Sequence, residues 1–317
     1  MYQKWRSYIF SVIIFLVFIL IIFLNLLQAP ATFPVDSIYT VEKGVGLNTL
    51  TNDLLAKQII KSGFWFKAFS VILGGAKGII AGDYVFNNEQ NVVSIAYRIS
   101  HGDYRLTPIK ITIPEGLNIT EISQIISGKF PQITEEAFIK FASSSEGYLF
   151  PDTYFFLPNV TAVETVKVMQ DNFSNKISSI NIDIINFKKP VSDVIKMASI
   201  VEEEARTEET RKIVAGILWK RLSLGMPLQV DSSFKYINGK GTKDLTLADL
   251  KIDSLYNSYK YKGLPPTPIC NPGLDSIIAT ITPNSTDYLY FLSDIKGDMH
   301  YAQTFAEHLR NKELYLD

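Results

Sequence analysis

A long uncharged apolar segment near the N-terminus constrains this chain most. Residues 7–27, SYIFSVIIFLVFILIIFLNLL, number 21 and include no acidic or basic side chain. A helix rises about 1.5 Å per residue, so this segment can span the roughly 30 Å hydrocarbon core of a bilayer. Lys4 and Arg6 precede it, and no basic residue follows it closely. Because the basic flank tends to stay in the cytoplasm, the pattern predicts a cytoplasmic tail at residues 1–6, a transmembrane helix, and residues 28–317 outside.

A cleaved signal peptide is the alternative interpretation of the same segment. A signal peptide has an apolar region of about 7–15 residues, followed by a small-x-small cleavage site. Here the apolar segment is longer, and the sequence Gln28-Ala29-Pro30-Ala31 is a poor cleavage site. These two features favour an uncleaved anchor.

Composition excludes several classes of protein. The net charge is −1, which argues against a nucleic-acid partner because phosphate binding needs a basic surface. Cys270 is the only cysteine, so no internal disulfide framework is possible. His101, His300 and His308 lack zinc-ligand spacing, and no HExxH, Walker A or helix-opening GxGxxG motif occurs. We therefore expect neither a metal nor a cofactor.

The rest of the chain is long enough for two α+β domains. Residues 28–37 contain two prolines and predict a short linker. Residues 38–106 predict a small mixed domain, with strands at 38–41 and 84–86 and helices at 47–60 and 92–99.

Residues 107–317 predict a larger mixed domain. It opens with an alternating strand at 109–113 and contains a second strand at 288–292. The dense prolines and glycines of Gly263–Gly273, GLPPTPICNPG, are typical of an ordered loop. Helical patterns occur at 119–127, 134–143, 161–178, 191–206, 208–223, 247–252 and 274–280.

Three consecutive glutamates lie near the end of the helix predicted at 191–206. At 100° per residue, Glu202 lies nearest the apolar face of this helix, Glu204 lies further round, and Glu203 points away from it. Partial burial favours the protonated form of a carboxyl group, and a general acid must hold a proton near neutral pH. Glu202 is therefore the candidate acid, and Glu203 is expected to be solvated.

A purely structural interpretation of Glu202 is an ion pair with Arg206 at i+4. Such a pair contributes only about 0.2–0.5 kcal/mol on a helix surface. Acidic triplets on helices are common and most are solvated, so spacing alone leaves both interpretations open.

Four separated sequence blocks resemble the MltG (YceG-like) family of endolytic murein transglycosylases. The blocks occur in family order, and the similarity covers most of residues 38–310. They are EGYLFPDTY, MASIVEEEARTEETRKIVAGILWKRLSLGMPLQVDSS, LYNSYKYKGLPPTPICNPG and YLYFLSDIKGDMHYAQTFAEH. The family's catalytic acid is the first glutamate of the SIVE motif, which falls on Glu202. Residues 39–60 resemble the LysM-like subdomain that precedes the catalytic domain, which implies either contact with N-acetylglucosamine-containing glycan or a scaffold role.

The resemblance also implies roles for other residues. Substrate-binding positions fall on Gln229, Asp231, Tyr256, Asn257 and Tyr259. Their structural alternatives are turn capping for the first two and a packed loop anchor for the others. Glu204 matches an acidic position that could support the acid, or could form an ion pair. His300 and His308 match family positions for which we expect structural roles. The departures are Ser232 for proline, Ser233 and Ser258 for threonine, and Thr267 for glycine.

The activity implied by the resemblance is cleavage of the β-1,4 bond between N-acetylmuramic acid and N-acetylglucosamine. One glutamate protonates the leaving oxygen and then activates the sugar's own 6-hydroxyl, which leaves a 1,6-anhydro end. The enzyme would terminate or trim nascent glycan strands at the inner (plasma) membrane, with its catalytic domain periplasmic or extracellular. Cell-wall synthases are candidate partners. A muramidase-type hydrolase that uses Asp231 as a second carboxylate, and a non-catalytic glycan-binding scaffold, are the alternatives.

Overall fold

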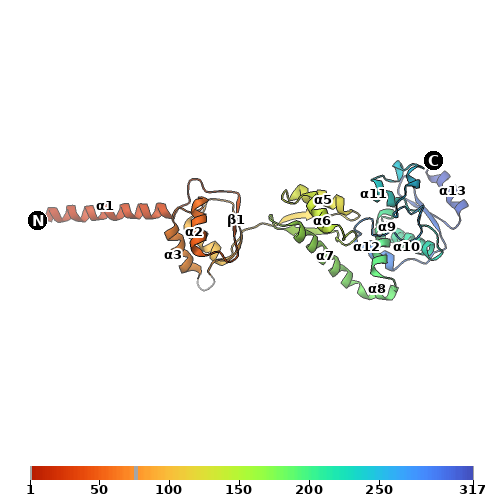
Figure 1. Ribbon diagram of the computed structural model, residues 1–317, viewed down its shortest axis with the longest axis horizontal. Coiled ribbons are helices and arrows are strands. Elements are labelled where there is room, and N and C mark those ends of the chain that lie inside the picture. Colours follow the sequence, from red (N-terminus) through yellow and green to blue (C-terminus); the bar gives the residue numbers. More distant parts are fainter. Residues whose placement is uncertain (1, 75–77, 317) are drawn as a thin grey trace. The chain divides into compact units, whose positions relative to one another are not determined.

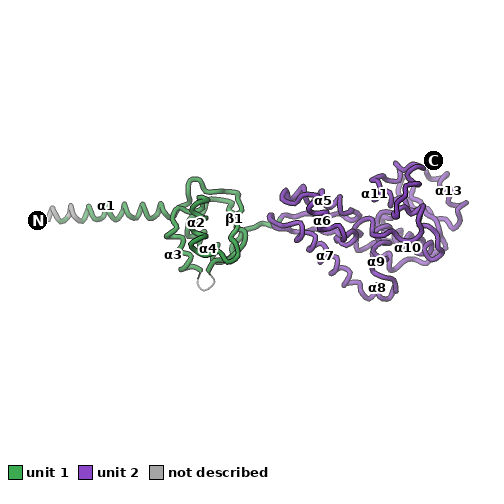
Figure 2. The backbone as a smooth tube through the Cα atoms, viewed as in Figure 1, with its two compact units in different colours: residues 1–108 green, residues 109–317 purple. Residues whose placement is uncertain are grey.

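The chain divides into two compact units, residues 1–108 and 109–317 (Figure 2). The structure is a computed structural model that describes residues 2–74 and 78–316. The fold is mixed α+β and mostly helical, and its strands form three two-stranded antiparallel sheets. The predicted α+β class is confirmed at this level.

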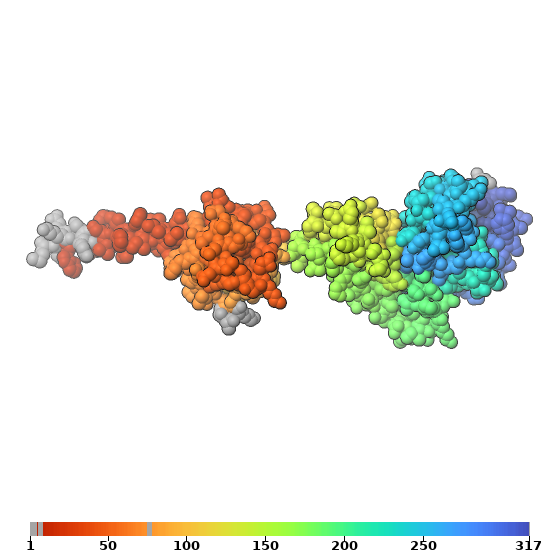
Figure 3. Space-filling view, in the orientation of Figure 1, coloured from red at the N-terminus to blue at the C-terminus, as the bar shows by residue number. Residues whose placement is uncertain are grey.

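Unit 1 begins with one long apolar helix. Helix α1 (Tyr2–Leu27) includes a stretch, Ile9–Leu27, that is long and apolar enough to cross a membrane. None of that stretch is buried, and Figure 3 shows most of it projecting away from the rest of the unit. A membrane anchor and a signal sequence both fit this helix.

The remainder of unit 1 is a small two-stranded sheet covered by three helices (Figure 1). Ile38 pairs with Val85 in the antiparallel sheet. Arg98 is 1% exposed. It joins β2 to the segment after α4, because its guanidinium donates to the carbonyl oxygens of Val85, Asp103 and Tyr104. The elements are β1 (Ser37–Val41), α2 (Leu47–Ala56), α3 (Gly63–Gly74), β2 (Gly82–Phe86) and α4 (Val92–His101).

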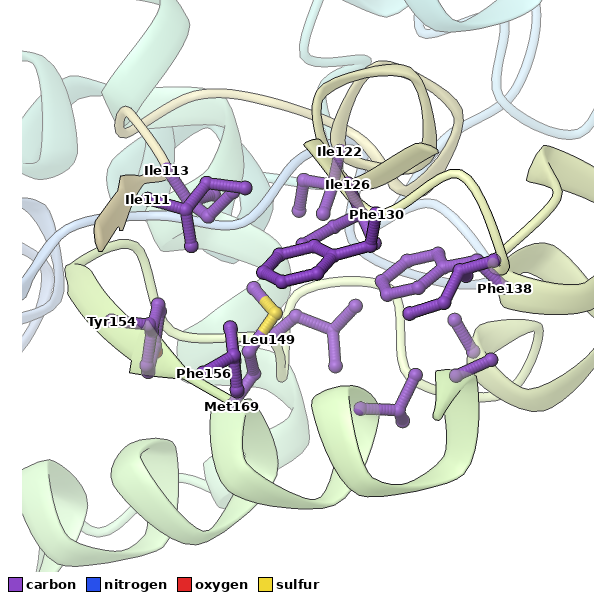
Figure 4. Close-up of a cluster of buried hydrophobic side chains, with 14 of the residues drawn as sticks. Ile111, Ile113, Ile122, Ile126, Phe130, Phe138, Leu149, Tyr154, Phe156 and Met169 are labelled. Carbon is purple, nitrogen blue, oxygen red and sulfur yellow. The ribbon is translucent and has the colours of Figure 1, made fainter. Parts of the chain in front are cut away.

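Unit 2 starts with a sheet of two strands packed against three helices. Strands β3 (Ile109–Thr112) and β4 (Thr153–Phe156) pair with Ile111 opposite Tyr154. Capping boxes begin two of the helices, where Asn118 and Glu121, and Thr161 and Glu164, satisfy free backbone N–H groups. Phe130 lies among aliphatic and aromatic side chains from all these elements (Figure 4). The helices are α5 (Ile119–Lys129), α6 (Glu135–Ala142) and α7 (Ala162–Ser179).

The second half of unit 2 is built around α9 (Val191–Glu204). Val194, Ala198 and Val201 on this helix are completely buried, since α10 and α12 pack against it. The other elements are α8 (Asn181–Phe187), α10 (Glu208–Ser223), α11 (Ser232–Asn238), two 3₁₀ turns (Thr242–Asp244 and Asp249–Lys251), α12 (Leu274–Ile281), β5 (Tyr290–Ser293), β6 (Met299–Ala302) and α13 (Phe305–Tyr315).

Several element predictions differ from the structure. The helix predicted at 247–252 is only the 3₁₀ turn Asp249–Lys251, since Asn257 takes up the carbonyl oxygens of Leu250 and Ile252 with its side chain. The segment expected to be a linker contributes Phe33 to the core of unit 1, where the centroids of the Phe33 and Phe86 rings lie 5.3 Å apart. Several elements were not predicted, among them α3, β4, α8, α11, β6 and α13.

We predict that Phe130→Ala lowers the free energy of unfolding of unit 2 by about 3–5 kcal/mol, because it removes a completely buried ring and leaves a cavity. Phe155 on β4 is 66% exposed, so Phe155→Ala should change it by less than about 0.5 kcal/mol. Urea unfolding of residues 28–317 in a Trp65→Phe background, followed by Trp219 fluorescence, measures both. Equal effects of the two variants would contradict the packing of this core.

Candidate active site

Glu202 lies at the C-terminal end of α9 with both carboxylate oxygens engaged. Its side chain is 6% exposed. Arg211 Nη2 donates to Oε1 at 2.8 Å, and the backbone N–H of Gly273 donates to Oε2 at 2.8 Å. The carboxylate is therefore fixed by one group from α10 and one from the loop before α12. Because each carboxylate oxygen has two lone pairs, each retains a position where a proton can be held.

The cation paired with Glu202 is Arg211, and the Arg206 pair considered from the sequence is absent among the described residues. Helix α9 ends at Glu204, and Ala205 is extended, so Arg206 lies outside the helix. Helix α10 then folds back and brings Arg211 to the carboxylate. Arg211 Nε donates to the carbonyl oxygen of Ala205 at 3.2 Å, which fixes the guanidinium across the turn.

Glu203 is not solvated, so that expectation was wrong. Its side chain is 18% exposed, and Lys235 Nζ on α11 donates to Oε1 at 3.1 Å. Burial raises the pKa of the Glu203 carboxyl, and the lysine opposes that shift. The helical wheel assumed one buried face, whereas α11 and the segment around Gly116 cover the opposite side as well.

Glu204 faces α11, and among the described residues it forms no hydrogen bond with Glu202. Its Oε1 accepts a hydrogen bond from the Ser232 backbone N–H at 3.3 Å. Burial raises the pKa of the Glu204 carboxyl to about 7, and the nearby Asp231 adds to the shift. Any stabilisation of Glu202 by Glu204 therefore acts through the end of α9, on which both residues lie.

A second carboxylate, Glu115, lies beside Glu202 and was missed in the sequence. It follows β3 in the sequence Pro114-Glu115-Gly116, directly after the strand predicted at 109–113. A Cβ atom on Gly273 would lie 1.9 Å from Glu115 Oε1, so only glycine permits this approach. Burial, and then the charge of Glu202, raise the pKa of the Glu115 carboxyl.

The proline-rich loop that carries Gly273 is attached to α9 and to two other segments. The Ser199 hydroxyl on α9 accepts from the Ile269 N–H at 3.1 Å. Asn271 is 1% exposed, and its Nδ2 donates to the carbonyl oxygen of Leu117 at 2.9 Å and to Glu146 Oε1 at 3.1 Å. The loop is ordered, as its composition predicted, because buried polar groups hold it on both sides.

Pro266, Thr267 and Pro268 of this loop line a pocket of about 510 Å³. Tyr236 and Tyr256 line it with ring centroids 4.8 Å apart, and the Tyr256 hydroxyl lies 2.8 Å from Thr267 Oγ1. Glu146, from EGYLFPDTY, also lines the pocket and is only 7% exposed. Burial raises the pKa of the Glu146 carboxyl to about 7. The pocket thus combines aromatic faces with one carboxyl group that readily holds a proton.

The other predicted binding residues lie on two adjoining segments. Gln229 is exposed, and its side-chain oxygen accepts from Arg221. Asp231 Oδ1 accepts from the Tyr259 hydroxyl at 2.6 Å. Asn257 is completely buried, and its amide is used by backbone groups at 250, 252 and 259. Those contacts are the ones a packed loop anchor would make.

The two histidines that match family positions lie in the C-terminal hairpin and α13. His300 Nε2 is 3.1 Å from Asp294 Oδ2, and its ring stacks on Tyr315. His308 stacks on Tyr290. Among the described residues, neither histidine forms a hydrogen bond or ion pair with Glu202.

Comparisons with known proteins show the family to which this chain belongs. The profile of the YceG-like family matches residues 39–314. An endolytic murein transglycosylase of Bacillus subtilis is 31% identical in an alignment of 303 residues that covers 87% of this chain and 84% of the relative. One of Streptococcus pneumoniae is 35% identical in an alignment of 201 residues that covers 61% of this chain and 36% of the relative. The crystal structure of a YceG-like protein from Listeria monocytogenes is similar, with a TM-score of 0.59, 27% identity, and coverage of 86% of this chain and 98% of that one.

We predict that Glu146 makes folding stability fall as pH rises. An unfolded glutamate has a pKa of about 4.3, whereas the folded value is about 7, so between these values the folded state retains a proton that the unfolded state has lost. In this window the unfolding free energy of the wild type should fall with rising pH more steeply than that of Glu146→Gln, by up to about 1.4 kcal/mol per pH unit. Urea unfolding of residues 28–317 from pH 4.5 to 7.5 measures it. Glu313→Gln, at an exposed position, serves as the control, and an unchanged slope for Glu146→Gln would contradict the assignment.

Proposed function

The chain belongs to the YceG-like family, and on that premise we propose that it is a membrane-anchored endolytic lytic transglycosylase of peptidoglycan. The bond cleaved is the β-1,4 linkage between N-acetylmuramic acid and N-acetylglucosamine, and the products carry 1,6-anhydro ends. One observation carries the proposal. The glutamate of the SIVE motif is nearly buried, and an arginine and a backbone N–H fix both of its oxygens.

In the first step, protonated Glu202 donates its proton to the glycosidic oxygen as the bond to the anomeric carbon breaks. N-acetylglucosamine leaves with a free 4-hydroxyl, and positive charge develops on the muramic sugar. Glu202 becomes a carboxylate, which Arg211 and the Gly273 N–H stabilise by charge-assisted hydrogen bonds. These donors are already in place, so little reorganisation accompanies the change of charge.

In the second step, the Glu202 carboxylate takes the proton of the sugar's own 6-hydroxyl. The oxygen released attacks the anomeric carbon and closes the 1,6-anhydro ring. The proton therefore passes from Glu202 to the leaving sugar and is replaced by the proton of the 6-hydroxyl, so one carboxyl group serves as acid and then as base.

Glu115 is the best-placed second carboxyl group. Its residue is exposed, and its carboxylate lies against Gly273, whose N–H holds Glu202. We assign it to orienting a sugar hydroxyl beside the acid. This position also favours one alternative, a hydrolase in which Glu115, rather than Asp231, activates water.

The aromatic side chains that line the 510 Å³ pocket suit a glycan strand, and so do polar side chains of residues 229–231 and 257–259, which lie outside its lining. Tyr256 offers a ring face for a pyranose, with Tyr236 beside it. Gln229 and Asp231 are assigned to sugar hydroxyls, and Tyr259 orients Asp231 through its hydroxyl. Asn257 acts indirectly by holding this segment, and Glu204 supports the end of α9.

The location follows from α1. We assign it as an uncleaved anchor in the plasma (inner) membrane, with its N-terminus in the cytoplasm and unit 2 periplasmic or extracellular. From there the enzyme would terminate or trim nascent strands and work beside cell-wall synthases. The LysM-like part of unit 1 is a candidate for contact with the same glycan.

We predict that the chain converts purified glycan strands to fragments with 1,6-anhydro ends, and that Glu202→Gln lowers the rate at least about 10³-fold, because both proton transfers are lost. Mass spectrometry of the products measures the outcome. Glu203→Gln is the matched control, since it alters the Lys235 pair and leaves the acid in place, and it should cost less than tenfold.

The products separate the alternatives. Reducing ends in place of anhydro ends would identify a hydrolase. Binding of glycan with no cleavage, and no effect of Glu202→Gln, would identify a scaffold.

We also predict that Arg211→Gln lowers kcat about 10²-fold with little change in KM, because the acid loses the group that fixes it. Arg206→Gln is the control, since that arginine precedes α10 and lies outside the pair, and its rate should stay within about twofold of wild type. Steady-state kinetics on glycan strands measure both. Arg211→Lys should recover part of the rate, and an equal loss in both arginine variants would refute this role.

A further inference from the structure

Helix α3 presents an apolar face that no other described residue covers. Phe64 and Ile72 are each 72% exposed, and Val71 is 68% exposed. Lys67 is the only charged residue in the twelve of this helix, GFWFKAFSVILG. Phe66 and Ser70, on its other side, are buried in the core of unit 1. An apolar face of this kind on a surface helix marks an interaction site.

This face is continuous with the apolar surface of α1. The Trp65 ring packs edge-on against Phe23 of α1, with centroids 4.8 Å apart. Lys61 Nζ lies 3.5 Å from the carbonyl oxygen and from Oδ1 of Asn25. In Figure 1, α3 lies at the end of unit 1 that α1 enters. On the helix, Ile72 projects within about 20° of Trp65, so the side that meets α1 merges into the exposed face.

The contact with Phe23 also fixes how deep α3 lies. Phe23 belongs to the membrane-crossing stretch Ile9–Leu27, four residues before its end. Four residues correspond to about 6 Å along the helix axis. If α1 spans the bilayer, Trp65 therefore lies about one turn below the end of the span, at the depth where acyl chains meet headgroups. Tryptophan is enriched at this depth.

A groove beside α3 adds room for apolar groups. It has a volume of about 820 Å³ and lies between α2 and α3, with Leu55 on one side and Phe64 and Val71 on the other. Lys67 stands at its rim, where Nζ donates to Asn48 Oδ1 at 2.9 Å. Lysine beside phenylalanine and tryptophan is typical of helices that lie in the bilayer interface.

We propose that the face formed by Phe64, Ala68, Val71 and Ile72 lies in the lipid interface of the membrane that α1 spans. Helix α3 is then an interfacial helix, and it holds unit 1 against the bilayer surface in addition to the anchor α1. Lipid covers this face, at the boundary between acyl chains and headgroups. The inference rests on the proposed retention of α1 as an anchor.

Fluorescence quenching of the full chain in lipid nanodiscs tests this. Trp5, Trp65 and Trp219 are replaced by Phe, and a single Trp is introduced at Leu16 (mid-span), at Ile72 (the face) or at Ile38. Ile38 is 46% exposed and is the matched control. It belongs to β1, a strand that Figure 2 shows at the end of unit 1 away from α1. The discs contain phosphatidylcholine and phosphatidylglycerol, with a doxyl quencher at carbon 5 or carbon 12 of the acyl chain.

The expected result is that Leu16→Trp is quenched most by the deep label. Ile72→Trp should be quenched most by the shallow label, and at least about twofold more than Ile38→Trp. Quenching at Leu16 with none at Ile72 would overturn the inference and leave the anchor intact. Loss of quenching at Leu16 would remove the anchor and the inference together. An intermolecular disulfide from Ile72→Cys, with Ile72→Trp unquenched, would assign the face to a second copy and overturn the proposal.

Discussion

The buried side-chain amide of Asn271 joins three segments on which the position of Glu202 depends. Its Nδ2 donates to the carbonyl oxygen of Leu117 and to Glu146 Oε1, and its Oδ1 accepts from the Leu149 N–H at 2.8 Å. Its backbone pairs with the segment after β3. A buried amide with every polar atom satisfied holds its loop in one geometry, because any displacement would leave several buried groups without partners. Two residues on, the Gly273 N–H is thereby aimed at Glu202.

The site therefore depends on loops whose conformation is fixed from several directions. Prolines restrict the backbone of this loop, and Ser199 ties it to the completely buried face of α9. Gly273 has no side chain, so the Glu115 carboxylate can lie against the residue whose N–H serves Glu202. Two like charges close together favour the protonated form of one of them. The proposed acid is thus supported from two sides, by Arg211 on α10 and by the Gly273 N–H on the loop.

The sequence predicted the helices that carry the site better than the contacts within it. Periodicity located α9 and α10, and it identified Glu202 as the glutamate nearest the apolar face, which agrees with its 6% exposure. It failed for Glu203, because a helical wheel represents one packing partner and α9 has neighbours on several sides. Arg211 and Glu115 were missed because their contacts depend on how α10 folds back and on where the loop after β3 meets Gly273. Local spacing carries no information on either event.

Helix α3 was missed for a different physical reason. An amphipathic helix is recognised because one side faces water, and periodicity detects the contrast between its two sides. In α3 the buried side holds Phe66, and the exposed side holds Phe64, Val71 and Ile72, so that contrast is absent. A helix that is apolar all round needs an apolar environment all round. The core of unit 1 supplies half of it, and a lipid surface at the end of α1 would supply the other half. The feature that hid this helix in the sequence is thus the same feature that points to its contact with the membrane.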